Sequence, residues 1–246
     1  MKKPILLFIA LLFLVVSADA NYYGVIARKN VYVETPPDWV VSNSASGSGT
    51  TCTVALTTVA GSNRGFVFFA LWEEGARAPS TMTFDDNAMT SITATTRGTR
   101  EIQMWYYANS AYSGTGSKNF VLTLDGSVAK MCWAAQIDGV DQADFLDASA
   151  AFSVDGTDPN TITLTLDPVD TNTLMVSGAG IGDVDDFLTA ANGQTRDANT
   201  VIGLTGSSIA GGYEDNVSGA SDTHVWTSAS TYLNELGIII SINPSN

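Results

Sequence analysis

The stretch from Gly65 to Glu74, GFVFFALWEE, contains an unbroken apolar run from Phe66 to Trp72. A helix with such a run could not be amphipathic, and Phe, Val and Trp favour the pleated surface of a β-sheet. Turn residues at 61–63 (GSN) precede the run and two carboxylates follow it. We therefore predict a central strand that is buried on both faces.

The rest of the chain predicts further strands that pair with or face this one. Apolar and polar residues alternate in several short segments, which include 52–59, 101–107, 120–124, 130–137, 162–166 and 236–242. Gly, Asp and Asn turns separate these segments, and none shows helical periodicity. Because parallel sheets need crossover helices, the pattern predicts an all-β fold, an antiparallel β-sandwich or barrel.

The N-terminal residues 1–20 have the form of a signal peptide. Lys2 and Lys3 precede an apolar segment at 5–16, and Ala18-Asp19-Ala20 supplies the small residues that a signal peptidase recognises. Cleavage after Ala20 predicts a secreted protein that is extracellular or held at the cell surface. The alternative is an uncleaved membrane anchor. The C-terminal residues show no second hydrophobic span and no lipid-anchor pattern.

After the signal peptide we predict three further regions. Residues 21–41 form an N-terminal arm that contains a break at Pro36-Pro37, and residues 42–51 (SNSASGSGTT) form a flexible Ser/Gly-rich linker. Residues 52–246 form the β-sandwich domain.

The chain is acidic, with 25 Asp and Glu against 11 Lys and Arg and a formal net charge of −14. This charge repels phosphate backbones and anionic lipid surfaces, so we expect no nucleic-acid partner and no membrane-embedded state after signal cleavage. The two cysteines, Cys52 and Cys132, form a disulfide if the chain is exported. The alternative is two separate buried thiols.

Several strand and turn motifs resemble a loose family of uncharacterised exported and phage-associated β-sandwich proteins. The matching segments are the turn 61–64 with the strand that ends at Glu73, then 105–107, 139–142 with 145–147, 172–176 and 237–242. This resemblance covers the chain from about Gly61 to Ile242. It implies a jelly-roll-like sandwich of extracellular or particle-surface type, without an established chemistry.

Two loops are rich in aspartate and suggest a calcium site. The candidate ligands are Asp138, Asp141, Asp144 and Asp147 in one loop, and Asp183, Asp185 and Asp186 in the other. Crowded carboxylates suit calcium. However, neither loop has the Asp-x-Asp-x-Asp-Gly order of a calcium loop, and solvated turn residues are the alternative.

Aromatic residues suggest a glycan-binding platform. Trp105 and Tyr107 share a strand face with Glu101 and Gln103, so we expect these two aromatic side chains to be the most exposed. The alternative is that the aromatic residues pack in the core.

The sequence contains no convincing catalytic motif. The single histidine, His224, is expected on a strand facing solvent, and no Gly-x-Ser-x-Gly elbow accompanies it. Glu73 and Glu74 are adjacent on a strand, so they point to opposite faces and cannot act as a glycosidase pair.

These observations predict a non-enzymatic extracellular structural or adhesive surface protein. A carbohydrate-binding module is the alternative, and a glycan-active hydrolase or lyase is the third candidate. Residues 22–34 are apolar enough to dock as a strand on a second copy, which would give filaments. The competing hypothesis is that this arm folds back as an edge strand of its own domain.

Overall fold

The segment GFVFFALWE forms β2 (Gly65–Glu73), and eight of its nine residues are buried. The computed structural model describes residues 36–245, except for 74–76, 155–160, 168–170, 182–188, 192–193, 203–206, 219–220 and 228–234. Every regular element in these ranges is a β-strand, and every strand pair is antiparallel. The prediction of an all-β antiparallel fold is confirmed.

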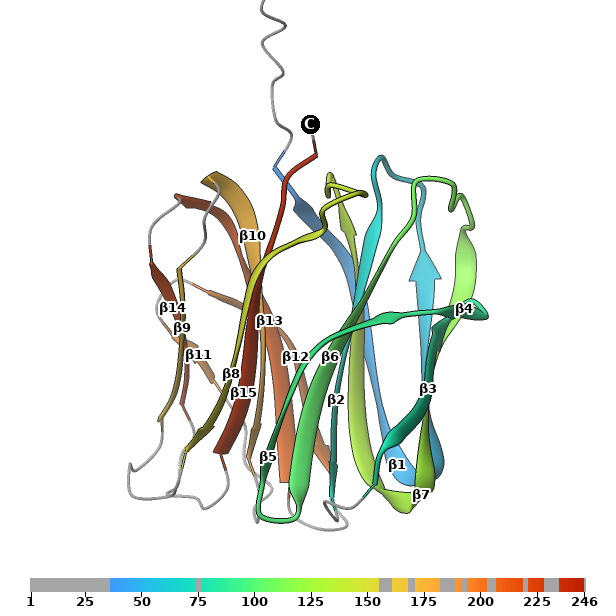
Figure 1. Cartoon of the computed structure of the whole chain (residues 1–246), viewed down its shortest axis with the longest axis vertical. Helices are drawn as coiled ribbons and strands as arrows, with labels where there is room; N and C mark the ends of the chain where they lie inside the picture. Colours follow the sequence, from blue (N-terminus) through green and yellow to red (C-terminus); the bar gives the residue numbers. More distant parts are fainter. Residues whose placement is uncertain are drawn as a thin grey trace, which may run out of the picture. The chain divides into compact units, whose positions relative to one another are not determined.

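The strands form three sheets, which lie side by side in Figure 1. The large sheet contains β1 (Asp38–Thr58), β2, β3 (Pro79–Phe84), β4 (Asn87–Ala88), β5 (Thr90–Arg97), β6 (Arg100–Ala108) and β7 (Gly116–Asp138). The middle sheet contains β8 (Leu146–Val154), β10 (Thr171–Ile181), β12 (Thr195–Ile202), β13 (Ser207–Ser218) and β15 (Glu235–Ile242). The outer sheet contains β9 (Thr161–Leu166), β11 (Thr189–Ala191) and β14 (Asp222–Thr227).

The large sheet is folded over on itself by its two longest strands. β1 and β7 contain 21 and 23 residues and pair with each other from Asp38↔Asp138 to Thr58↔Gly116. The register shifts between Gly49 and Thr51, where Gly49 has a φ of 124°. Figure 1 shows both strands running down the molecule and turning back up at this bend. Along its other edge, β7 pairs with β3 through residues 120–124 and with β2 through residues 130–137. The two halves of this β1/β7 ribbon therefore belong to two facing parts of the large sheet, which we call its walls.

This folding-over creates a core inside the large sheet. Phe66, Phe68 and Trp72 of β2 face inward, toward side chains from both halves of the ribbon. The opposite side of β2, which carries Val67, Phe69 and Leu71, packs in a second core against the middle sheet. A third core lies between the middle and outer sheets. The predicted burial of the central strand on both faces is therefore confirmed, because β2 lies between two cores.

The predicted Ser/Gly-rich linker at 42–51 is wrong. These residues lie inside β1, and Ser42 to Gly49 are paired with Ala135 to Val128 of β7. Their small side chains suit a half-exposed part of a strand that bends at Gly49. Residues 36–41 of the predicted arm also run directly into β1, whereas the predicted signal peptide and residues 21–35 lie outside the described residues.

The predicted disulfide between Cys52 and Cys132 is present. Cys52 lies in the second half of β1 and Cys132 in the second half of β7, with Cα atoms 6.5 Å apart. Both side chains belong to the core inside the large sheet. The bond therefore links the two facing walls across that core.

We expect the variant Cys52→Ala/Cys132→Ala to lose about 4 kcal/mol of unfolding free energy in the chain-entropy model, because the bond closes a loop of 80 residues. Denaturant unfolding of the oxidised wild type and the variant measures this loss. A reductant should destabilise the wild type and leave the variant unchanged. Two free thiols in wild-type protein isolated without reductant would contradict the bond.

The contact between the large and middle sheets leaves no room at Gly178. A Cβ atom there would lie 2.5 Å from Cε2 of Phe69 on β2. We expect Gly178→Ala to destabilise the fold by about 1–3 kcal/mol through overpacking. Gly47→Ala is the matched control, because no heavy atom lies within 4 Å of its added Cβ. Equal denaturation midpoints for the two variants would show that the sheets do not meet at Gly178.

Candidate functional site

The aromatic residues proposed for glycan binding are buried. Trp105 and Tyr107 on β6 are 3% and 9% exposed and belong to the core inside the large sheet. Trp105 meets Phe68 edge-on, with ring centroids 5.8 Å apart. The expectation that they are exposed is wrong, because the folded-over ribbon covers the face of β6 that carries them.

The two polar residues of this predicted platform have other environments. The Nε2 of Gln103 donates a hydrogen bond to the Oγ of Ser91 on β5, at 2.6 Å. Partial burial raises the pKa of the Glu101 carboxyl. Among the described residues, Val59 is the one large apolar side chain that is exposed. The structure thus offers no aromatic row at the surface in these ranges.

The first aspartate loop is held by local contacts. The Oδ1 of Asp141 accepts hydrogen bonds from the backbone N–H groups of Ala143 and Asp144, at 2.7 and 3.0 Å. Asp138 Oδ1 accepts a bond from Gln136 Nε2, at 2.9 Å, and Asp147 lies at the start of β8. The described residues contain no group of three or more His, Cys, Asp or Glu side chains that could hold a metal ion. Asp183, Asp185 and Asp186 lie outside the described residues.

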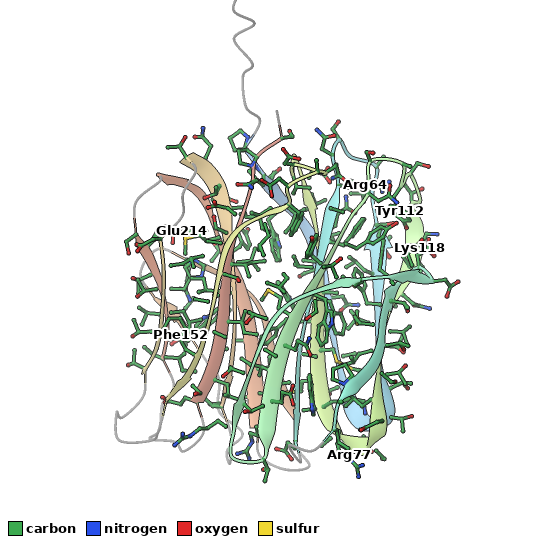
Figure 2. All side chains as sticks on the ribbon, in the orientation of Figure 1. Arg64, Arg77, Tyr112, Lys118, Phe152 and Glu214 are labelled. Atoms are coloured by element: carbon green, nitrogen blue, oxygen red, sulfur yellow. A yellow bond between two sulfur atoms is a disulfide. The ribbon has the colours of Figure 1, made fainter. Side chains whose placement is uncertain are left out.

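His224 is the centre of a buried polar cluster between the middle and outer sheets. It lies on β14 and is fully buried, so its expected exposure to solvent is wrong. Its Nδ1 lies 2.7 Å from the Oγ of Ser177 on β10, and that oxygen also accepts a bond from Trp226 Nε1 at 3.1 Å. The Nε2 lies 3.7 Å from Glu214 Oε2 on β13, which is too far for a hydrogen bond. Figure 2 labels Glu214 in this part of the molecule.

The cluster contains the residue types of a serine–histidine–carboxylate triad but lacks access for a substrate. Ser177 and His224 are both fully buried. Burial lowers the pKa of His224 to about 4, against the weaker opposing effect of Asp222. Burial, together with Asp222 and Asp215, raises the pKa of Glu214. A neutral His224 can accept a hydrogen bond from the Ser177 hydroxyl at Nδ1, and its Nε2 then faces Glu214 without a hydrogen bond. The Ser177–His224 contact joins two sheets.

Strand periodicity contained the signal for this burial. His224 and Trp226 are two residues apart, so they share a face, while Thr223, Val225 and Thr227 point the other way. A tryptophan on that face indicates a core. Ser177 carried no such signal, because its strand is rich in small residues and its partner is 47 residues away.

A second polar cluster joins the large sheet to the middle sheet. Arg100 Nη2 lies 3.5 Å from Glu73 Oε1, and Arg100 Nε donates to Ser207 Oγ at 3.3 Å. The Ser207 hydroxyl also donates to Glu73 Oε1. Both charged side chains are largely buried, with 7% and 12% of their surface exposed. Glu73 is therefore engaged in a link between strands β2, β6 and β13.

Lys130 stabilises the bend of the ribbon. It is fully buried on β7, and its ammonium group donates to the carbonyl oxygens of Gly49 and Val128. Burial lowers the pKa of this ammonium group. The two carbonyls belong to the segments where β1 and β7 turn back, so Lys130 satisfies acceptors at the bend.

Charged and aromatic groups also secure the loops at one end of the large sheet. Arg64 donates to the carbonyl oxygens of Val59, Gly114 and Tyr112, and its guanidinium lies 5.2 Å from the Tyr112 ring centroid. The Tyr112 hydroxyl donates to Asp85, which pairs with Lys118 at 2.8 Å. The bond from Lys118 holds the pKa of Asp85 below its usual value. Figure 2 shows Arg64, Tyr112 and Lys118 close together at this end.

A shallow pocket of about 300 Å³ lies at the same loops. It is lined by Asn63, Ser110, Val140, Asp141, Gln142, Ala143 and Ser245. The Nε2 of Gln142 donates to the carbonyl oxygen of Arg64 at 2.7 Å, so this side chain also braces the loop. The C-terminal segment closes one side, where Ser245 N–H donates to the Gly139 carbonyl at 2.7 Å.

No family model matches the chain, and no curated protein or solved structure matches it either.

The His224 cluster predicts a pH-dependent stability. The folded pKa of about 4 lies below the ordinary value of 6.5, so between these values the unfolded chain binds the proton and the folded protein does not. Stability should fall as the pH drops from about 6.5 to about 4, by about 3 kcal/mol from this group. Denaturant unfolding at several pH values measures it. Because nearby carboxyls also titrate, the His224→Gln variant supplies the background, and an identical pH profile for both proteins would contradict the assignment.

Proposed function

We propose that the chain is a non-enzymatic structural or adhesive protein that acts outside the cell. The observation that carries this proposal is the use of reactive residue types as connections between layers. The Ser177–His224 pair, the Glu73–Arg100–Ser207 cluster and the Cys52–Cys132 bond each join two sheets or two walls. Such connections suit a protein that must stay folded without cellular support.

The geometry gives little support to an enzyme. The serine and the histidine that could form a nucleophile and a base are fully buried. Glu73 is tied to Arg100 and Ser207. A hydrolase needs its acid, base or nucleophile within reach of the substrate. The glycan-binding alternative also has little support, because its candidate residues Trp105 and Tyr107 are buried in the core.

The finer description of the fold belongs to this proposal. A long antiparallel ribbon that folds over and closes on itself supports a jelly-roll-like architecture. Export through the N-terminal signal peptide, followed by release or retention at the cell surface, is consistent with the disulfide. The described part of the chain contains no helix that is long and apolar enough to cross a membrane.

Self-association through residues 22–34 is the proposed mode of assembly. This segment lies shortly before the start of β1 at Asp38 and contains Val25, Ile26 and Val31 to Val33. A strand donated to a second copy in a head-to-tail manner gives an open filament. Folding back onto its own domain is the competing arrangement.

Export and assembly are tested together on the secreted protein. We expect N-terminal sequencing of the protein in the medium to begin at Asn21. Size-exclusion chromatography and electron microscopy should show assemblies that disappear when residues 21–35 are deleted. Retention of the uncleaved chain inside the cell would overturn the extracellular role. A secreted protein that remains monomeric at high concentration would overturn the assembly mode alone.

A further inference from the structure

The outward side of the folded-over wall of the large sheet presents hydroxyl-bearing side chains. This hydroxyl face consists of Thr51, Thr53, Ala55 and Thr57 on β1, Ser117, Asn119, Val121 and Thr123 on β7, and Thr81 and Thr83 on β3. The residues between them point inward, and Val54, Leu122 and Phe84 are almost completely buried. Strict alternation therefore places all ten side chains on the surface side.

The side chains of the hydroxyl face lie in register across three strands. One row contains Thr51, Thr123 and Thr81, and the next contains Thr53, Val121 and Thr83. Neighbouring strands lie about 4.8 Å apart, and successive rows lie about 6.7 Å apart along the strands. Threonine is β-branched, so its methyl and hydroxyl groups have restricted orientations. The face thus presents methyl and hydroxyl groups in a two-dimensional repeat.

The hydroxyl face carries no charged side chain, although the whole chain has 36 charged Asp, Glu, Lys and Arg residues, 25 acidic and 11 basic. Asp125, two residues after Thr123, marks one end of the uncharged area, and the Lys118–Asp85 ion pair beside Asn119 marks the other. Exposed edge strands often carry charged side chains that prevent association. One carbonyl on the β1 edge is also covered, because Asn43 Nδ2 donates to Ala55 O at 2.7 Å. A partner would therefore bind the face of this wall rather than its β1 edge.

The hydroxyl groups of this face are free to bond outward. In the described part of the chain, no hydrogen bond involves the side-chain hydroxyls of Thr51, Thr53, Thr81, Thr83 or Thr123. On the outer sheet, by contrast, Thr165 bonds Thr223 at 3.1 Å and Thr189 bonds Thr227 at 2.5 Å. Threonines on that sheet therefore use their hydroxyls within the protein. The hydroxyls of the hydroxyl face are therefore available as donors and acceptors for hydrogen bonds to a surface outside the molecule.

The partner must be neutral, ordered and rich in hydrogen-bonding groups. A crystalline polysaccharide would call for exposed aromatic rings, which the described surface lacks. A second copy of the chain would call for an apolar patch, whereas this face is mainly hydroxyl and small side chains. Ordered water satisfies all three requirements: lattice oxygens can bond the hydroxyls while methyl groups occupy hollows between them. We propose that the hydroxyl face binds the surface of ice, which deepens the proposed adhesive role and rests on it.

The test uses the purified, disulfide-bonded secreted protein. Partition into a slowly growing ice hemisphere and inhibition of ice recrystallisation are measured for the wild type and for Thr53→Lys/Thr81→Lys. Both positions are exposed, so the substitutions should leave the thermal unfolding curve unchanged. The control is Thr90→Lys/Thr96→Lys, which adds the same charge at two exposed positions on β5. We expect Thr53→Lys/Thr81→Lys to lose ice partition and the control to keep it.

The outcomes separate this inference from the proposed function. Absence of the wild type from ice, or full binding by Thr53→Lys/Thr81→Lys, overturns the ice-binding face. Retention of the wild type on crystalline cellulose or chitin, but not on ice, also overturns it, as does a dimer that forms through this face without ice binding. None of these results affects secretion or assembly through residues 22–34, which are measured independently.

Discussion

The folding-over of the β1/β7 ribbon is the constraint on which the rest of the structure depends. A single ribbon, paired along its whole length, supplies two facing walls and therefore encloses a core by itself. The bend interrupts the regular pairing of β1 with β7 near Gly49. The ammonium group of buried Lys130 donates hydrogen bonds to the carbonyl oxygens at this bend. Closing the ribbon on itself also places β2 in the interior, with one side facing the enclosed core and the other available to the middle sheet. The layered architecture follows from this one placement.

Layering has a cost, because polar groups on the inner strands have no access to water. Buried donors and acceptors must find partners in the neighbouring layer or remain unsatisfied. Arg100 meets Glu73 and Ser207 in this way, and His224 meets Ser177. Close approach of layers also restricts side-chain volume: Gly180 lies against Leu71, as Gly178 lies against Phe69. These contacts explain why residues that resemble catalytic groups by type are structural in this chain.

The local sequence pattern predicted the features of the fold that depend on neighbouring residues, namely the strands and the burial of the central strand. The apolar run at 66–72 and the alternation in later segments were sufficient for an antiparallel all-β fold and for a strand buried on both sides. Alternation also grouped Trp105 with Tyr107 correctly, but it could not say which side of the strand would be covered, because that depends on a ribbon distant in sequence. Ser42 to Thr51 resembled a linker since composition cannot distinguish a bent edge strand from a flexible segment. His224 was placed in solvent although Trp226 on the same face indicated the interior.

The register of the ribbon also determines the order in which this protein can fold. Asp38 pairs with Asp138 and Thr58 with Gly116, so β1 cannot pair until β7 has been synthesised. The β5/β6 hairpin closes locally, whereas the ribbon requires loop closure over long sequence separations, which slows folding. Until β7 arrives, Val54 and Leu56 of β1 have no core in which to pack. The strand that begins the domain can thus be among the last to reach its final position, and this interval is when the chain is most exposed to aggregation.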